Sequence, residues 1–208
     1  MMYQTTYHGV HPSALSQEEW VEILSLHQKV FPFSSEVITH LIKERESLLL
    51  YREKKTNTLI GTIGCSFLSL NSFLILYMGN VVIDPAHQKN GLFLHGQYYY
   101  ALKAMMRYPF RRKFVCGFAM TEESARWAKH FPIHWPKENT FTPEPMFHLM
   151  KGIAEKLVGK GGYTVEERKI FVQRLPLRQM LVLGPINARN ATAGLFSLLK
   201  RSWQRRFL

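Results

Sequence analysis

The segment from Val81 to Phe93 contains the residues of this sequence whose types and spacing could do chemistry. It reads as a strand that ends at Asp84-Pro85, followed by a polar loop and by Gly91, where a long helix is expected to begin. Such a junction points unpaired backbone N–H groups along the positive end of a helix dipole, which suits a phosphate group. Gly91 allows a tight turn and the close approach of a pyrophosphate, Asn90 tolerates left-handed torsions, and Lys89 adds a cation. On spacing alone, the simpler interpretation is a glycine that only permits a turn.

These residues resemble the acyl-CoA signature of the GCN5-related N-acetyltransferases (GNAT), a strand ending in V-x-(V/I)-D-P followed by Q/R-x-x-G-x-G/A. Gln88 and Gly91 match it, Asp84 stands four residues before the glutamine, and Phe93 replaces the last small residue. The resemblance covers roughly residues 1–131. It implies acetyl-CoA or another acyl-CoA as co-substrate, held by backbone groups of two segments. These are Val81, Val82 and Ile83 for the pantetheine arm, and Gln88, Lys89, Asn90, Gly91, Leu92 and Phe93 for the pyrophosphate.

The resemblance also implies residues for proton transfer, because in this family a general base removes the amine proton and an acid often protonates the leaving thiolate. The helix expected over residues 121–131 has Ala125 in the family position, but Glu122 in place of the usual Asn and Lys129 in place of the usual Tyr. The catalytic candidates are Asp84, Glu122, Tyr77 and His130, with Glu123 and His134 as further options.

Each catalytic candidate has a structural alternative. Asp84 before a proline is typical of a turn, Glu122 at a helix start favours the dipole, and Tyr77 in a strand is typical of packing. His130 is expected to face solvent beside a proline-rich link. The sequence predicts no metal site, because it has no HExxH motif and a proline interrupts the helix after His130.

Local patterns predict the elements that must position these residues. Helices are expected from a capping box at Ser16 to about residue 30, from residue 34 or 35 to about 45, and over residues 91–108 and 146–158. Strands are expected over residues 48–51, 59–70, 73–83, 113–120, 170–173 and 180–183. This order predicts an α+β fold, with a GNAT-like mixed, mostly antiparallel central sheet flanked by helices and a C-terminal helical extension.

Residues 1–185 are expected to form one GNAT-like acyltransferase domain, and residues 186–208 a basic amphipathic helix. In this tail an apolar residue recurs every fourth position, at Leu195, Leu199, Trp203 and Phe207. A helix of this type can lie on a membrane surface, so peripheral membrane contact is one interpretation. Docking of the apolar stripe on the domain is the other, and it is favoured.

The chain of 208 residues carries 27 Lys and Arg against 15 Asp and Glu, a net charge of +12 that predicts attraction to anions. A basic cluster consists of Lys103, Arg107, Arg111, Arg112 and Lys113. Three partners fit it: the 3′-phosphate of CoA, an acidic acyl carrier protein, and nucleic acid. Nucleic acid is not favoured, because no zinc finger, helix-turn-helix or RNA-binding signature is found.

Cys65 and Cys116 lie in apolar runs and are expected to be buried thiols. The N-terminus lacks the pattern of a signal peptide, and no apolar run approaches the roughly 18 residues of a membrane span. A reducing cytoplasm is therefore the expected location.

Three functions are consistent with these patterns. The first is an N-acyltransferase that moves an acetyl or other acyl group from acyl-CoA to a primary amine of a small molecule or peptide, by direct attack in a ternary complex. The second takes its acyl group from acyl carrier protein, as the N-acyl amino acid and acyl-homoserine lactone synthases of this fold do. The third is a non-catalytic binding module, motivated by Phe93 and Lys129.

Overall fold

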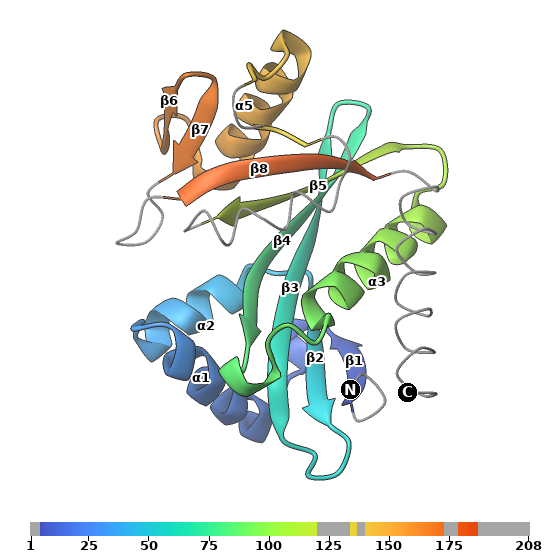
Figure 1. Cartoon of the computed structure of the whole chain (residues 1–208), viewed down its shortest axis with the longest axis vertical. Coiled ribbons are helices and arrows are strands. Elements are labelled where there is room, and N and C mark those ends of the chain that lie inside the picture. Colours follow the sequence, from blue (N-terminus) through green and yellow to red (C-terminus); the bar gives the residue numbers. More distant parts are fainter. Residues whose placement is uncertain (1–4, 120–133, 137–139, 173–178, 187–208) are drawn as a thin grey trace. The chain divides into compact units, whose positions relative to one another are not determined.

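The computed structural model describes residues 5–119, 134–136, 140–172 and 179–186. In chain order its elements are β1 (Thr5–Val10), η2 (Pro12–Ala14), α1 (Gln17–Val30), α2 (Ser35–Lys43), β2 (Ser47–Glu53), β3 (Leu59–Leu70), β4 (Phe73–Ile83), η3 (Pro85–His87), α3 (Leu92–Arg107), β5 (Arg112–Ala119), α5 (Glu144–Val158), β6 (Tyr163–Glu166), β7 (Lys169–Val172) and β8 (Gln179–Ile186) (Figure 1). The described strands form a sheet of eight in the order β1-β2-β3-β4-β5-β8-β7-β6. The pairs β1–β2, β2–β3, β5–β8, β7–β8 and β6–β7 are antiparallel. The predicted α+β class with a mostly antiparallel sheet is confirmed.

The described residues fall into two compact units, to which β3 and β4 both contribute. Unit 1 comprises residues 5–67 and 78–107, and unit 2 comprises residues 68–77 with the described residues from 108 to 186. Each unit has its own cluster of buried apolar side chains. The single domain expected over residues 1–185 stays a prediction.

Unit 1 has helices on both faces of its strands. Successive residues of β2 point to opposite faces, so Leu48 and Leu50 share one face while Tyr51 belongs to the other. Leu48 and Leu50 pack in a buried cluster with residues of α1 and α2. Tyr51 lies against α3, where a Cβ built at Gly96 would lie 3.1 Å from the Tyr51 hydroxyl oxygen. The strands therefore separate α3 from α1 and α2.

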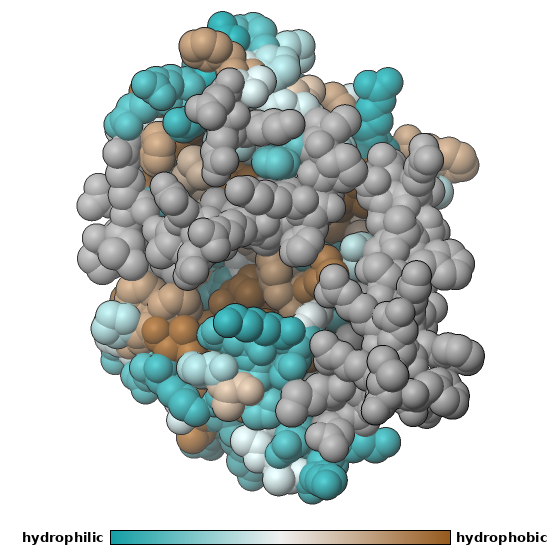
Figure 2. Space-filling view, in the orientation of Figure 1, coloured by the Kyte–Doolittle hydropathy of each residue, from teal (hydrophilic) through white to brown (hydrophobic). Residues whose placement is uncertain are grey.

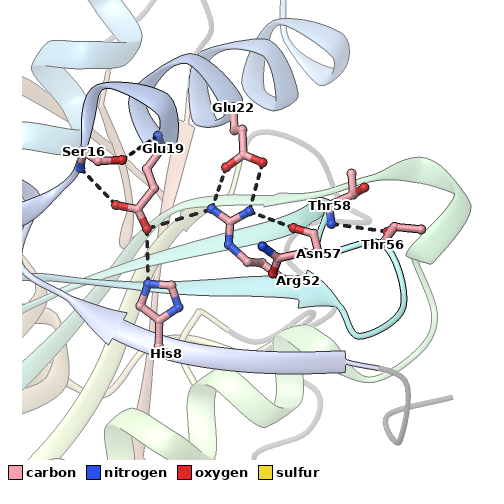
Figure 3. Close-up of polar contacts among 8 residues, drawn as sticks. All are labelled: His8, Ser16, Glu19, Glu22, Arg52, Thr56, Asn57 and Thr58. Carbon is pink, nitrogen blue, oxygen red and sulfur yellow. Dashed lines mark hydrogen bonds and ion pairs between the residues drawn. The ribbon is translucent and has the colours of Figure 1, made fainter.

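An ion-pair network around Arg52 joins β1, α1 and β2 (Figure 3). Arg52 of β2 binds both carboxylate oxygens of Glu22 on α1, with Nη1 2.9 Å from Oε1. Glu19 completes the capping box with Ser16, and its Oε1 lies 3.4 Å from Nε2 of His8 on β1 and 3.9 Å from Nη2 of Arg52. We call Arg52, Glu22, Glu19 and His8 the Arg52 network; its members come from three elements and fix α1 against the edge of the sheet.

Unit 2 has α5 packed on its strands. Its buried cluster contains Ile75 of β4, Cys116 of β5 and Ile153 of α5. Cys116, like Cys65 of unit 1, is a thiol with 0% exposure, which confirms the expectation of buried thiols for both cysteines.

Most elements agree with the sequence patterns, and two strands do not. The caps at Ser16 and Ser34 and the strands over residues 59–70 and 73–83 are confirmed. β1 and β6 are not expected from the sequence, because their residues are mostly exposed and therefore lack a clear alternation of apolar and polar side chains. The helix expected over residues 121–131 and the tail beyond residue 186 lie outside the described residues. Among the helices that are described, none has the length and apolar character needed to cross a membrane.

Candidate functional site

Asp84 anchors the end of β4 to α1. Its amide donates to the Ile60 carbonyl of β3 at 2.9 Å. Its carboxylate accepts from the Ala86 amide at 2.9 Å and pairs with Nζ of Lys29 on α1 at 2.6 Å. The hydrogen bond from Lys29 is the main reason that the pKa of Asp84 lies below its usual value. This geometry supports the turn-forming interpretation of Asp84, because a carboxylate with a lowered pKa is a weaker general base.

The loop between η3 and α3 turns through two residues in the left-handed region, Lys89 with φ of 63° and Gly91 with φ of 80°. Asn90, the residue best suited to that region by type, does not adopt it. Gln88 closes the loop at its start, where its amide donates to the Pro85 carbonyl at 3.4 Å and its side-chain Nε2 donates to the Ile83 carbonyl at 3.4 Å. The chain therefore reverses sharply just before α3 begins.

Backbone donors gather at this reversal. The amide of His95 donates to the Gly91 carbonyl at 2.9 Å and so opens the ladder of α3. Within the described part of the chain, the amides of Lys89, Asn90, Gly91 and Leu92 have no acceptor. The first turn of α3, all of it described, carries no acidic side chain, and Lys89 is exposed. Figure 2 shows hydrophilic residues where this loop lies in Figure 1. Free amides, a helix dipole and a nearby cation together favour an anion.

All residues predicted to bind the cofactor lie at this end of unit 1. Val82 is buried in the cluster with α1 and α2, whereas Val81 and Ile83 beside it are half-buried. The remaining predicted residues follow along the loop and the start of α3: Gln88, Lys89, Asn90, Gly91, Leu92 and Phe93. Their roles in binding stay predictions, and the structure shows that they form one continuous feature.

Tyr51 holds the first turn of α3, a role that the sequence does not reveal. Its hydroxyl donates to the Leu92 carbonyl at 3.0 Å and lies 2.9 Å from Nδ1 of His95. A tyrosine has one hydroxyl proton, so Nδ1–H of His95 donates to the Tyr51 oxygen. Burial lowers the pKa of His95 and raises that of Tyr51, so both are neutral at pH 7. A buried tyrosine in a strand gives no signal of this contact, because its partner is 41 residues away.

The other catalytic candidates are not brought together by the described residues. Tyr77 belongs to unit 2, is 5% exposed, and packs its ring 5.6 Å from that of Phe118, which supports the packing alternative. Glu122 and His130 lie outside the described residues, and their roles stay predictions. Among the residues that are described, no three His, Cys, Asp or Glu side chains gather as metal ligands.

No family model and no curated protein matches this sequence. Among solved structures, N-acetylglutamate synthase from Neisseria gonorrhoeae, complexed with coenzyme A and N-acetyl-glutamate, is similar with a TM-score of 0.51 and 10% identity. The match covers 88% of this chain and 35% of the synthase, so this chain spans about a third of it. An acyl-CoA N-acyltransferase from Pseudomonas aeruginosa has a TM-score of 0.46 and 13% identity, over 86% of this chain and 99% of that one. The ribosomal-protein-S18-alanine N-acetyltransferase from Escherichia coli has a TM-score of 0.47 and 10% identity, over 88% and 94%.

Identities this low bear on the fold alone. The N-acetylglutamate synthase matches with a TM-score above 0.5, and the described elements form the α+β fold with a mostly antiparallel sheet that the family resemblance implies. The chain therefore has the acyl-CoA N-acyltransferase fold of the GCN5-related N-acetyltransferases.

Proposed function

We propose that this chain is an N-acyltransferase that moves an acetyl or longer acyl group from acyl-CoA to a primary amine by direct attack in a ternary complex. The observation that carries the proposal is the junction before α3. There the amides of Lys89, Asn90, Gly91 and Leu92, which have no acceptor among the described residues, meet the positive end of a 16-residue helix. The synthase of similar fold was determined with coenzyme A bound.

The junction fits the pyrophosphate of CoA. With φ of 80° and no Cβ, Gly91 lets a phosphate approach the backbone closely. Lys89 and the dipole of α3 add attraction for a dianion. Within the predicted segment from Gln88 to Phe93, the amides of Lys89, Asn90, Gly91 and Leu92 would hold the pyrophosphate. Backbone groups of Val81–Ile83 would pair with the amides of the pantetheine arm.

In the transfer, the acceptor nitrogen attacks the thioester carbonyl, and the C–N bond forms as the C–S bond breaks. The amine proton passes to a base, and the thiolate leaves as the CoA thiol after protonation. The ion pair with Lys29 makes Asp84 an anchor of the loop, so Glu122 is the preferred carboxylate base. His130 and His134 stay the candidates for the acid, because Tyr77 is buried against Phe118 in unit 2. The acceptor is a small-molecule or peptide amine.

The net charge of +12 favours acyl carrier protein as an alternative donor. The structure narrows the basic cluster that would receive it. Arg111 holds the β3–β4 turn through three hydrogen bonds of 2.6–2.9 Å. Lys113 is 7% exposed and donates to backbone carbonyls at 2.7 and 3.5 Å. Arg111 and Lys113 are therefore the members of the basic cluster that are least available to a carrier protein.

The proposal is tested first by ligand binding. Thermal unfolding is measured with CoA, acetyl-CoA and a long-chain acyl-CoA, and a ligand at about 100 times its Kd adds about 2.7 kcal/mol to stability. No shift with any of the three would overturn the proposal. Thiol release and product mass over a panel of amines then test transfer, and binding without transfer supports the non-catalytic module.

The donor is tested separately. Acyl-CoA and acyl carrier protein bearing the same acyl group are compared as donors at low and high salt. Transfer from the carrier protein alone, lost at high salt, would replace CoA by the carrier protein as donor, because contacts between exposed charges are screened by salt.

A further inference from the structure

Asn80 interrupts β4 with a left-handed backbone. Its φ is 52°, whereas the described residues on either side of it lie within the same strand. Residues other than glycine rarely adopt this region, and asparagine does so more readily than most. A left-handed residue within a strand changes the direction of the residues that follow it, which here are Val81–Ile83.

The side chain of Asn80 is held by a buried arginine. Nε of Arg45, the second residue after α2, donates to Oδ1 of Asn80 at 2.9 Å and to the Leu41 carbonyl at 3.2 Å. The side chain of Arg45 is 3% exposed, and its Nη2 lies 3.4 Å from Glu44. A charged group taken this far out of water needs fixed partners, so Arg45 constrains Asn80 strongly.

The backbone of Asn80 is held from a second direction. The hydroxyl of Thr62 on β3 donates to the Asn80 carbonyl at 3.3 Å, and its oxygen lies 2.9 Å from Nε2 of His27 on α1. A carbonyl can only accept, so the hydroxyl proton of Thr62 goes to Asn80 and Nε2–H of His27 donates to Thr62. Thr62 is 0% exposed and His27 is 4% exposed. Burial lowers the pKa of His27 to about 4, so the ring is neutral at pH 7 and Nε2 carries its one ring proton.

Arg45 and the β4 backbone pack closely against Gly64 of β3. A Cβ built at Gly64 would lie 2.8 Å from Cγ of Arg45 and 2.9 Å from the Gly79 carbonyl oxygen. Gly64 therefore admits the arginine between β3 and the strand carrying Asn80. Backbone strain persists only where the surroundings determine it. Here Arg45, just after α2, and Thr62 of β3 contact Asn80 directly, and His27 of α1 holds Thr62 in turn.

The contacts converge on the residue directly before the segment assigned to the pantetheine arm. We propose that His27, Thr62, Arg45 and Asn80, here called the Asn80 network, are positioning residues that aim the backbone of Val81–Ile83 at the acyl donor. The inference rests on the proposed function and deepens it, because it separates the residues that orient the pantetheine arm from those that bind the pyrophosphate. A network that served only the core would be expected to be apolar, like residues 74–76 of β4, which are all 0% exposed.

The test uses ligands that occupy different parts of the site. Coenzyme A engages both segments, whereas 3′-phospho-ADP, its nucleotide half, reaches only the loop before α3. Thr62→Val removes the hydroxyl at nearly constant volume, and Thr62→Ser keeps it. We expect Thr62→Val to weaken CoA binding about tenfold and 3′-phospho-ADP binding less than about twofold, with Thr62→Ser near wild type for both. Calorimetric titration of each protein with each ligand gives these ratios.

A second pair of variants covers the case in which Thr62→Val fails to fold. Asn80→Gly keeps the left-handed torsion but removes the acceptor of Arg45, and Asn80→Asp keeps the acceptor and adds an opposite charge beside it. The glycine variant should lose CoA affinity selectively, and the aspartate variant should retain it.

Equal losses for CoA and 3′-phospho-ADP, or no loss for either in both pairs, would overturn the inference. The inference would also be overturned if the wild type bound CoA no more tightly than 3′-phospho-ADP, because the pantetheine arm would then add no affinity. Failure of the wild type to bind CoA at all marks instead the failure of the proposed function.

Discussion

Two arginines of unit 1 are used in contrasting ways. Arg52, with its side chain 12% exposed, is paired with the carboxylates of Glu22 and Glu19 at the edge of the sheet. Arg45, with its side chain 3% exposed, binds the neutral amide of Asn80 through Nε inside the fold, and it also pairs with the carboxylate of the adjacent Glu44. The first arrangement joins three elements, and the second fixes the backbone conformation of one residue.

The contrast separates stability from ligand binding within one sheet. Charged partners at a half-exposed edge can be lost without altering the strands beyond them, because water solvates what remains. Contacts to a left-handed residue matter more, since a strained torsion persists only where its surroundings determine it. Changes at the Arg52 network should therefore lower stability alone, whereas changes along β4 and its loop should lower ligand affinity.

The largest effect on affinity is expected at Gly91. Gly91→Val places a branched side chain at φ of 80° and above the amides assigned to the pyrophosphate, so CoA affinity should fall by about 100-fold or more. Gly159, which caps α5 with φ of 79° and no atom within 4 Å of a Cβ built there, offers a matched control. Gly159→Val also places a β-branched residue at a positive φ, and it should bind CoA as the wild type does. Calorimetric titration with CoA compares the two variants. Equal CoA affinities for both would show that the pyrophosphate does not bind at the junction before α3.

The next largest effect is the acid sensitivity that His27 confers. Its pKa is lowered by burial from 6.5 to about 4, so between these values only the unfolded chain binds a proton at this site. The free energy of unfolding should therefore fall by about 3 kcal/mol in total as the pH is lowered through this window. Above the window, His27 contributes no pH dependence. Urea unfolding of the wild type and of His27→Gln from pH 7.5 to 4 measures the difference.

His27→Gln removes the titration and keeps a side-chain amide that can donate to Thr62. Its stability should lose less on acidification than that of the wild type, even though Asp84 also has a lowered pKa and both proteins share that contribution. Parallel curves for the two proteins over the whole range would contradict a neutral, buried His27.

Arg52→Met sharpens the other side of the comparison. The substitution keeps an unbranched apolar chain about as long as the aliphatic part of arginine. It leaves Glu22 and Glu19 without their cation and removes a hydrogen bond to the Asn57 carbonyl. Because the partners are partly exposed, the expected loss is about 1–2 kcal/mol of unfolding free energy, with CoA affinity unchanged. Lys54→Met, an equal change of charge at an exposed turn residue, should cost little. Loss of CoA affinity in Arg52→Met alone would show that the edge and the site are coupled.

The residues of this comparison differ in how far they can be predicted from the sequence. Gly91 and Gln88 stand out because spacing along a strand, a loop and a helix is a local property. The capping box at Ser16 and the bounds of β3 and β4 are local in the same sense. The contacts of Arg45 and Thr62 with Asn80 span 35 and 18 residues, and no local pattern records them.

Other features escape prediction for related reasons. β1 pairs with β2 at the edge of the sheet, and most of its side chains are exposed. Its sequence therefore lacks the alternation of apolar and polar residues that marks a half-buried strand. The left-handed torsion falls on Lys89 and not on Asn90, because the geometry of the turn overrides the preference of the residue type. Asp84 is a residue type that can serve as a general base. Its contact with Lys29, which the sequence does not reveal, shows instead that it anchors the loop.

The smallest effect is expected at Tyr51, which joins the scaffold to the site. Tyr51→Phe removes the hydrogen bond to the Leu92 carbonyl and the acceptor of His95, so stability should fall by about 1 kcal/mol. The first turn of α3 also loses an anchor, and CoA affinity should fall about threefold.

Tyr100→Phe is the matched control for this change. The Tyr100 hydroxyl, likewise buried, donates to the Ile63 carbonyl at 3.2 Å, but from a position two turns further along α3. Its loss should lower stability by a similar amount without altering CoA affinity, because the first turn keeps its own contact with Tyr51. If unfolding and titration give the two variants the same profile, Tyr51 packs the helix like any other residue of that face and does not position the loop.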